Sequence, residues 1–238
     1  MGYVFKFPYK LTINQFCAYL CAAIKLKIMN ISSISKKFVM TIAGFFLLAF
    51  LPVHLGINLL LLKNDPEPFN SAARFMATFP PVKIYESLLI ISILAHVIYG
   101  IFLQVSNWLA RPVGYVSDNK PETSFFSKFM IWTGASVLTF LVLHFFNFYF
   151  IKLGIVEGNP DDFYSVVHNL FKIPAYNFIY FTCFVLLGFH LYHAISSAFQ
   201  TFGINQIWTP IIKRAALIYA IIIPSGFAFI SISLWLFK

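Results

Sequence analysis

Apolar residues occupy most of this chain in long blocks that short polar stretches interrupt. Five blocks contain no Asp, Glu, Lys or Arg over a length that could cross a bilayer: 38–62, 87–110, 129–151, a long run that begins at Ile173, and 215–237. A hydrocarbon core about 30 Å thick needs roughly 20 apolar residues per helix. Because lipid offers the backbone no hydrogen-bond partners, blocks of this length predict helices rather than strands.

The run that begins at Ile173 stays uncharged as far as Ile212, which is too long for a single span. Within it, "GINQIWTP" (residues 203–210) predicts a loop followed by a helix that Pro210 opens. We therefore expect the fourth span to end near Gly203. The fold class predicted is an all-α integral membrane protein, an antiparallel bundle of five transmembrane helices in one domain over residues 29–238.

Composition agrees with a membrane protein, since 60% of the residues are hydrophobic, 11% are charged and the mean hydropathy is +0.80. The net charge of +9 does not favour a nucleic-acid partner, because the basic residues follow the membrane. Eleven of the 17 Lys and Arg flank the spans on the side of the N-terminus and six lie on the other side. The positive-inside rule then places the N-terminus in the cytoplasm.

Residues 1–28 have a different character from the rest of the chain. Leu11–Ile24 is an uncharged run too short to span, so this part is an extension upstream of a start at Met29, an amphipathic surface helix, or a signal peptide. A signal peptide is disfavoured because its removal would invert the charge bias. The three cysteines, Cys17, Cys21 and Cys183, form no CxxC pair, so neither an iron–sulfur cluster nor a disulfide framework is expected.

Two external loops are predicted. Lys63–Lys83 carries turn signals at "NDPEP", and Lys152–Lys172 is long enough for a short interfacial helix.

Five of the six histidines lie inside predicted spans: His54, His96, His144, His190 and His193. Ionisable side chains within a membrane are rare and are functional candidates by default. A single one is as well explained by a neutral ring that hydrogen-bonds a neighbouring helix. One on each of four successive helices is harder to explain by packing alone.

The depths of these histidines sort them into two levels. Counted at about 1.5 Å per residue from the outer ends of the spans, His54 and His144 lie about 12–13 Å deep. His96 and His190 lie about 20–24 Å deep by the same count, so the levels are roughly 10 Å apart. Each level joins two different helices.

Two histidines at one depth on facing helices can bind a haem from both axial sides. His190 and His193 share one helix face, so they cannot be opposite ligands of one iron. Zinc and di-iron sites need ligands clustered in one shell, often with carboxylates. The predicted spans contain no Asp or Glu. The sequence therefore predicts two stacked b-type haems with bis-histidine ligation.

Six stretches carry a resemblance to a known family, in family order over residues 33–205. They are "SISKKFVMTIAGFFL", "HLGINLLLLKNDPEPFN", "YESLLIISILAHVIYG", "NWLARPVGY", "LHFFNF" and "GFHLYHAISSAFQTFGIN". Here the chain resembles the cytochrome b membrane-anchor subunit of succinate dehydrogenase/fumarate reductase, in its five-helix, di-haem, single-chain type. The resemblance begins just after Met29, which favours the extension interpretation of residues 1–28.

The resemblance implies that His54 and His144 bind the outer haem iron and that His96 and His190 bind the inner one. It implies a flavoprotein subunit and an iron–sulfur subunit as cytoplasmic partners, and electron transfer between succinate or fumarate and a membrane quinone, with menaquinone expected. The location implied is the bacterial inner membrane. The chain itself would not contact succinate.

Glu86 is the only acid that borders a predicted span. It is either an interfacial charge in water or a proton acceptor for quinone beside the outer haem. Some relatives that use menaquinol have a Glu where this chain has Gly188, so a proton path through that position is not expected.

Lys37, Arg111 and His193 are candidates for the haem environment, by contact with propionates or, for His193, as a group beside the ligand. Ordinary positive-inside topology explains most of the basic residues equally well. Gly44, Gly56, Gly100 and Gly188 would let a flat porphyrin or another helix approach closely.

Two other functions remain open from the sequence. A haem-free transporter could use the histidines as a proton relay, although such proteins more often show charged spans, broken helices or internal repeats. A structural anchor that has lost its haems would not be expected to keep all four histidines.

Overall fold

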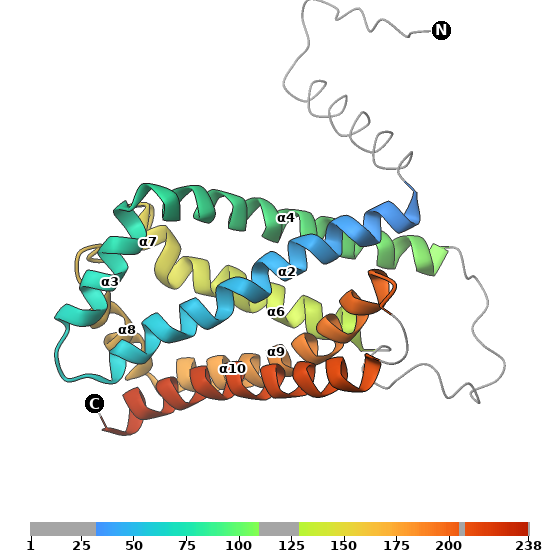
Figure 1. The fold of residues 1–238 in the computed structure, drawn as a ribbon. Helices are drawn as coiled ribbons and strands as arrows, with labels where there is room; N and C mark the ends of the chain where they lie inside the picture. Colours follow the sequence, from blue (N-terminus) through green and yellow to red (C-terminus); the bar gives the residue numbers. More distant parts are fainter. Residues whose placement is uncertain (1–31, 110–128, 205–207, 238) are drawn as a thin grey trace, which may run out of the picture.

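The computed structural model describes residues 32–109, 129–204 and 208–237. Its five long helical segments are α2 (Ser33–Asn58), α4 (Pro80–Leu109), α6 (Met130–His144) with its continuation to Lys152, α9 (Pro174–Thr201) and α10 (Thr209–Phe237). They run side by side as a bundle (Figure 1). The predicted all-helical class is confirmed over the described residues. The predicted boundary between residues 1–28 and the domain that begins at residue 29 lies outside the described residues.

The helices extend beyond the uncharged blocks that predicted them. α4 begins at Pro80, seven residues before Ser87. α10 begins at Thr209, before the uncharged block that starts at Ala215, and this start agrees with the helix predicted to open at Pro210. Charged residues interrupt an apolar block without interrupting a helix, because a helix can continue past the hydrocarbon layer into water. The fourth span ends as predicted, since α9 stops at Thr201 and Gly203 adopts a φ of 72°, which glycine accommodates without strain.

The two ends of the bundle differ. One end is where α2 begins and carries Lys36, Lys37, Lys213 and Arg214; we call it the basic end. The opposite end is covered by two short helices, α3 (Glu67–Thr78) and α8 (Phe163–Phe171), and is called the capped end. α10 ends at the capped end (Figure 1). α8 confirms the predicted short helix, whereas α3 occupies a segment where only turns were expected.

Large apolar side chains cover the outside of the bundle. Ile218, Ile222 and Phe229 of α10 are 57%, 57% and 60% exposed. A soluble protein rarely exposes continuous apolar surface on this scale. The five long helical segments are long and apolar enough to cross a membrane. The chain is therefore built as a multi-pass membrane protein, and its exposed face is a lipid-facing one.

The packed core sits toward the capped end. Leu55, Phe184, Phe227 and Leu234 belong to one buried cluster that also includes residues of α8. Gly226 belongs to this contact as well, because a Cβ there would come within 2.8 Å of the Leu55 side chain. The main contacts between long helices are α9 with α10 and α2 with α4, while α4 touches α6 in few places.

A polar network joins the two capping helices. Asp162 is the N-cap of α8, and its carboxylate accepts hydrogen bonds from the Ser165 amide at 3.2 Å and from the Asn70 side chain at 2.9 Å. Hydrogen bonds from the Ser165 side chain, then from the Asn70 side chain and the Ser165 amide, hold the pKa of Asp162 below its usual value. The Tyr164 amide donates to the Asn70 side-chain oxygen at 2.9 Å, which completes the link between α3 and α8.

Pro52 leaves a carbonyl without its helical partner inside α2. Proline has no N–H, so the carbonyl of Leu48, four residues earlier, loses its regular donor. The Tyr219 hydroxyl of α10 donates to that oxygen at 2.5 Å. The carbonyl that Pro52 leaves free in α2 therefore forms a hydrogen bond that joins α2 to α10.

We expect Tyr219→Phe to destabilise the bundle by about 1 kcal/mol, because the Leu48 carbonyl is left without a donor in an apolar setting. Thermal unfolding of the detergent-solubilised protein would measure the loss. Tyr176→Phe is the matched control, since the structure shows no hydrogen bond from the Tyr176 hydroxyl. Equal stability of the two variants would contradict a role for the Tyr219 hydroxyl.

Candidate haem-binding site

His54 of α2 faces His144 of α6 in the capped half of the bundle. The two ring centres are 5.8 Å apart and the rings are perpendicular. Aromatic side chains fix both rings, because Phe50 stacks on His54 at 5.1 Å and His144 lies between Phe140 and Phe148. We call these two histidines the capped-side pair.

His96 of α4 faces His190 of α9 closer to the basic end. Their ring centres are 6.3 Å apart with 79° between the ring planes. The Nδ1 atom of His96 lies 3.2 Å from the backbone oxygen of Met40 in α2. If Nδ1 carries the hydrogen, it donates a hydrogen bond to the Met40 carbonyl and Nε2 keeps its lone pair, which is the usual arrangement behind a metal-bound histidine. We call these two histidines the basic-side pair.

Two glycines lie against the basic-side pair. A Cβ at Gly44 of α2 would come within 3.3 Å of the His96 ring, and a Cβ at Gly134 of α6 would come within 3.5 Å of the His190 ring. The absence of a side chain at Gly44 and at Gly134 therefore lets α2 lie close to the His96 ring and α6 lie close to the His190 ring. Gly44 was predicted to permit close approach, whereas Gly134 was missed by the sequence reasoning.

The same spacing recurs on α2 and α6. His54 follows Gly44 by ten residues, and His144 follows Gly134 by ten residues. Because Gly44 and Gly134 mark the level of the basic-side pair, this spacing places the two pairs roughly 15 Å apart along the helices. The two levels predicted from depth are present, with a larger separation than the roughly 10 Å expected.

The dimensions of both pairs suit two imidazoles on one metal ion. A metal–nitrogen bond of about 2.1 Å on each side, with the half-width of each ring added, places such ring centres roughly 6 Å apart. The Nδ1 atoms of His144 and His190, one in each pair, are buried and have no hydrogen-bond partner. Over the described residues, no three His, Cys, Asp or Glu side chains come together as a metal site, so each pair offers two ligands.

Glu86 of α4 does not stand alone in water. Its carboxylate forms an ion pair with Lys152 at 2.7 Å, and the two side chains are 24% and 28% exposed. Lys152 lies 5.6 Å from the centre of the Tyr149 ring. Tyr149 ends a π-helical segment, Phe145–Tyr149, that directly follows His144. Such segments often occur at functional sites, and this one connects the capped-side pair to the ion pair.

The three residues predicted for the haem environment are Lys37, His193 and Arg111. Lys37 is exposed, while its neighbour Lys36 is 5% exposed. His193 is half-buried on α9, and Arg111 lies outside the described residues. Lys37, the exposed one of the two lysines, was singled out from the sequence, because nothing in the sequence says which of two adjacent residues turns inward.

Gly188 serves helix packing. A Cβ there would come within 3.0 Å of the Ala220 backbone oxygen in α10. No side chain lies within 4 Å of a Cβ built at Gly56, and Gly100 approaches the sulfur of Met40 at 3.8 Å. Neither Gly188, Gly56 nor Gly100 contacts a histidine ring in this way.

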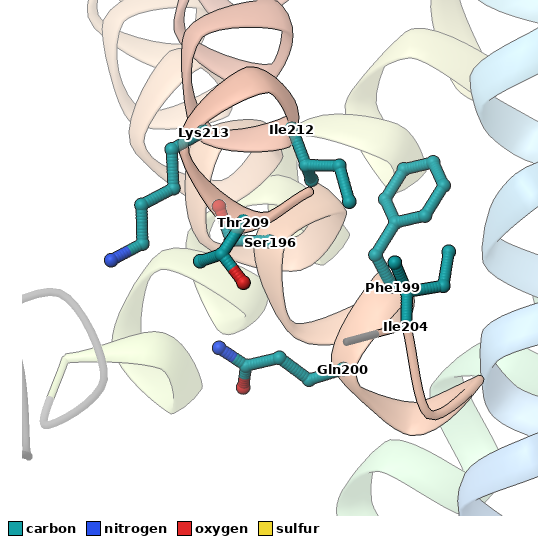
Figure 2. A pocket seen from close by; sticks show the side chains of 7 residues that line it. All are labelled: Ser196, Phe199, Gln200, Ile204, Thr209, Ile212 and Lys213. Carbon is teal, nitrogen blue, oxygen red and sulfur yellow. The ribbon is translucent and has the colours of Figure 1, made fainter. Parts of the chain in front are cut away.

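A small pocket lies at the basic end, where α9 ends and α10 begins. It is lined by Ser196, Phe199, Gln200, Ile204, Thr209, Ile212 and Lys213. Figure 2 shows the Lys213 ammonium on one side of it and the apolar Phe199, Ile204 and Ile212 on the other. None of the predicted site residues lines this pocket, so it has no part in the histidine site.

Comparisons of the chain with protein-family models, with curated proteins and with solved structures found no match.

Proposed function

We propose that this chain is the membrane anchor and di-haem electron-transfer subunit of a succinate:quinone oxidoreductase, respiratory complex II. The observation that carries the proposal is the arrangement of four histidines from four helices as two facing pairs at two levels of the bundle. The motif resemblance to the cytochrome b anchor subunits assigns the same four residues and the same pairing.

In this proposal His54 and His144 hold one haem b, and His96 and His190 hold the other. Held by two histidines, each haem would transfer single electrons and would offer no open position to oxygen. The chain's own contribution is orientation and exclusion of water. The Met40 carbonyl fixes the His96 ring, Phe50 stacks on His54, and the apolar helices surround both pairs.

The proposed partners are a flavoprotein subunit and an iron–sulfur subunit. They would dock at the basic end, which the positive-inside rule places on the cytoplasmic side of a bacterial inner membrane. The proposed electron acceptor or donor in the membrane is a quinone, with menaquinone expected. Glu86 would exchange the quinone's protons with water near the capped end. Lys152 would position the Glu86 carboxylate.

The test is the haem content of the chain purified together with its partner subunits. Pyridine haemochrome analysis is expected to give two b haems per chain, and a reduced-minus-oxidised spectrum is expected to show six-coordinate low-spin iron. One haem would mean that one histidine pair is wrongly assigned. Absence of haem from the assembled complex would end the cytochrome proposal and leave the haem-free transporter with a histidine relay as the better hypothesis.

A further inference from the structure

Lys36 is a buried cation near the start of a membrane-spanning helix. It is the fourth residue of α2, and only 5% of its surface is exposed, while Lys37 beside it is exposed. Lysines at the ends of such helices ordinarily extend their ammonium groups to water. Lys36 instead places its Nζ 4.3 Å from the centre of the Phe102 ring in α4.

The contacts between α2 and α4 place Lys36 on the same seam as the basic-side pair. Gly44 lies against the His96 ring, and the Met40 backbone oxygen lies 3.2 Å from its Nδ1. Lys36 comes one helical turn before Met40 and two turns before Gly44, so it lies on the same face of α2. The seam therefore runs from His96 along Gly44 and Met40 to Lys36, toward the basic end.

A buried ammonium at this position needs an anion. Removing a charge from water is strongly unfavourable unless the charge is paired, and the positive end of a helix dipole makes the position less favourable still. A cation–π contact with Phe102 offsets only a small part of this penalty. Glu67 pairs with Arg74 and Glu86 pairs with Lys152, so neither of these carboxylates is the partner of Lys36.

We propose that Lys36 binds a carboxylate of the tetrapyrrole held by His96 and His190, and that Lys37 does not. The inference rests on the proposed function. The basic-side pair is the one within reach, because His54 lies 18 residues further along α2, about 27 Å away along the helix. An ammonium donates up to three hydrogen bonds, and charge-assisted bonds to a carboxylate are the strong ones.

The test compares Lys36→Met with Lys36→Arg and with the exposed neighbour Lys37→Met, each in the complete complex. Haem content and a potentiometric titration of the two haems are the readouts. A nearby positive charge stabilises the reduced iron, so Lys36→Met is expected to shift the reduced-to-oxidised ratio of one haem about tenfold toward the oxidised form. For a one-electron couple this shift lowers the midpoint potential by about 59 mV. Lys36→Arg and Lys37→Met are expected to keep both potentials.

Loss of one haem in Lys36→Met that Lys36→Arg restores would support the same role. Two haems with unchanged potentials in Lys36→Met would overturn the inference and leave the proposed function standing. An equal loss of haem in Lys36→Arg would mean that Lys36 serves packing, and this result would overturn the inference as well. A wild-type complex without haem would instead reject the proposed function.

Discussion

Replacement of His54 or of His144 by alanine is expected to remove the same haem and to lower the haem content from two per chain to one. The reason is that each proposed iron depends on both histidines of its pair, whose ring centres are 5.8 Å apart. His96→Ala and His190→Ala are expected to remove the other haem. Pyridine haemochrome analysis of each purified complex measures the ratio, and the spectrum of the haem that remains identifies which one was lost.

Double variants make the pairing itself testable. His54→Ala with His144→Ala is expected to retain one haem, because both changes act on one iron and their effects do not add. His54→Ala with His96→Ala is expected to retain none. His193→Ala serves as the control, since it shares a helix with His190 and is expected to keep both haems. If the first double variant lost both haems, or if His193→Ala lost one, the assignment of pairs would be wrong.

The five spans could be predicted because lipid restricts the choices. An uncharged block of more than 20 residues has few structures available other than a helix, so the class follows from composition and length. Helix ends could not be predicted in the same way. Lys83 and Glu86 broke the apolar pattern, yet α4 continues through both. The segment Glu67–Thr78 forms a helix although "NDPEP" (residues 64–68), which overlaps its start, predicted turns.

The depth of a histidine follows from helical rise, but its neighbours do not. Counting residues from the ends of the spans gave the pairs that face each other in the structure, because antiparallel helices share one depth scale. The contacts of Gly134 with His190 and of Lys152 with Glu86 depend on how helices rotate against their neighbours. Helices that are apolar on every side give no such information, which is also why Lys37 was predicted where the structure buries Lys36.

The ion pair with Lys152 changes the interpretation of Glu86. An acid at the edge of a span was as well explained by contact with water as by chemistry. The structure shows it three-quarters buried, held at 2.7 Å by a cation that follows the π-helical segment after His144. Burial of a pair costs desolvation free energy on both sides, so an ion pair placed here for anchoring alone would gain little.

Glu86→Gln is therefore expected to lower quinone-linked turnover by about 100-fold or more, the usual effect of removing a general acid or base. Haem content should stay at two, because Gln keeps the shape of the side chain. Succinate oxidation with a soluble dye should be unchanged, because the proposed complex has its dicarboxylate site on a partner subunit. Glu67→Gln is the matched control, since Glu67 also forms an ion pair at the capped end, with Arg74 at 2.6 Å, but is 66% exposed.

Lys152→Met separates proton transfer from anchoring. If Glu86 accepts the proton itself, Lys152→Met retains measurable turnover and Glu86→Asp retains part of it, whereas Glu86→Gln retains almost none. If the ion pair only ties α4 to the segment after α6, then Lys152→Met and Glu86→Gln lose turnover equally and both become less stable. Full turnover in Glu86→Gln would reject any role for this carboxylate in quinone chemistry, and the quinone would then have to exchange its protons elsewhere in the complex.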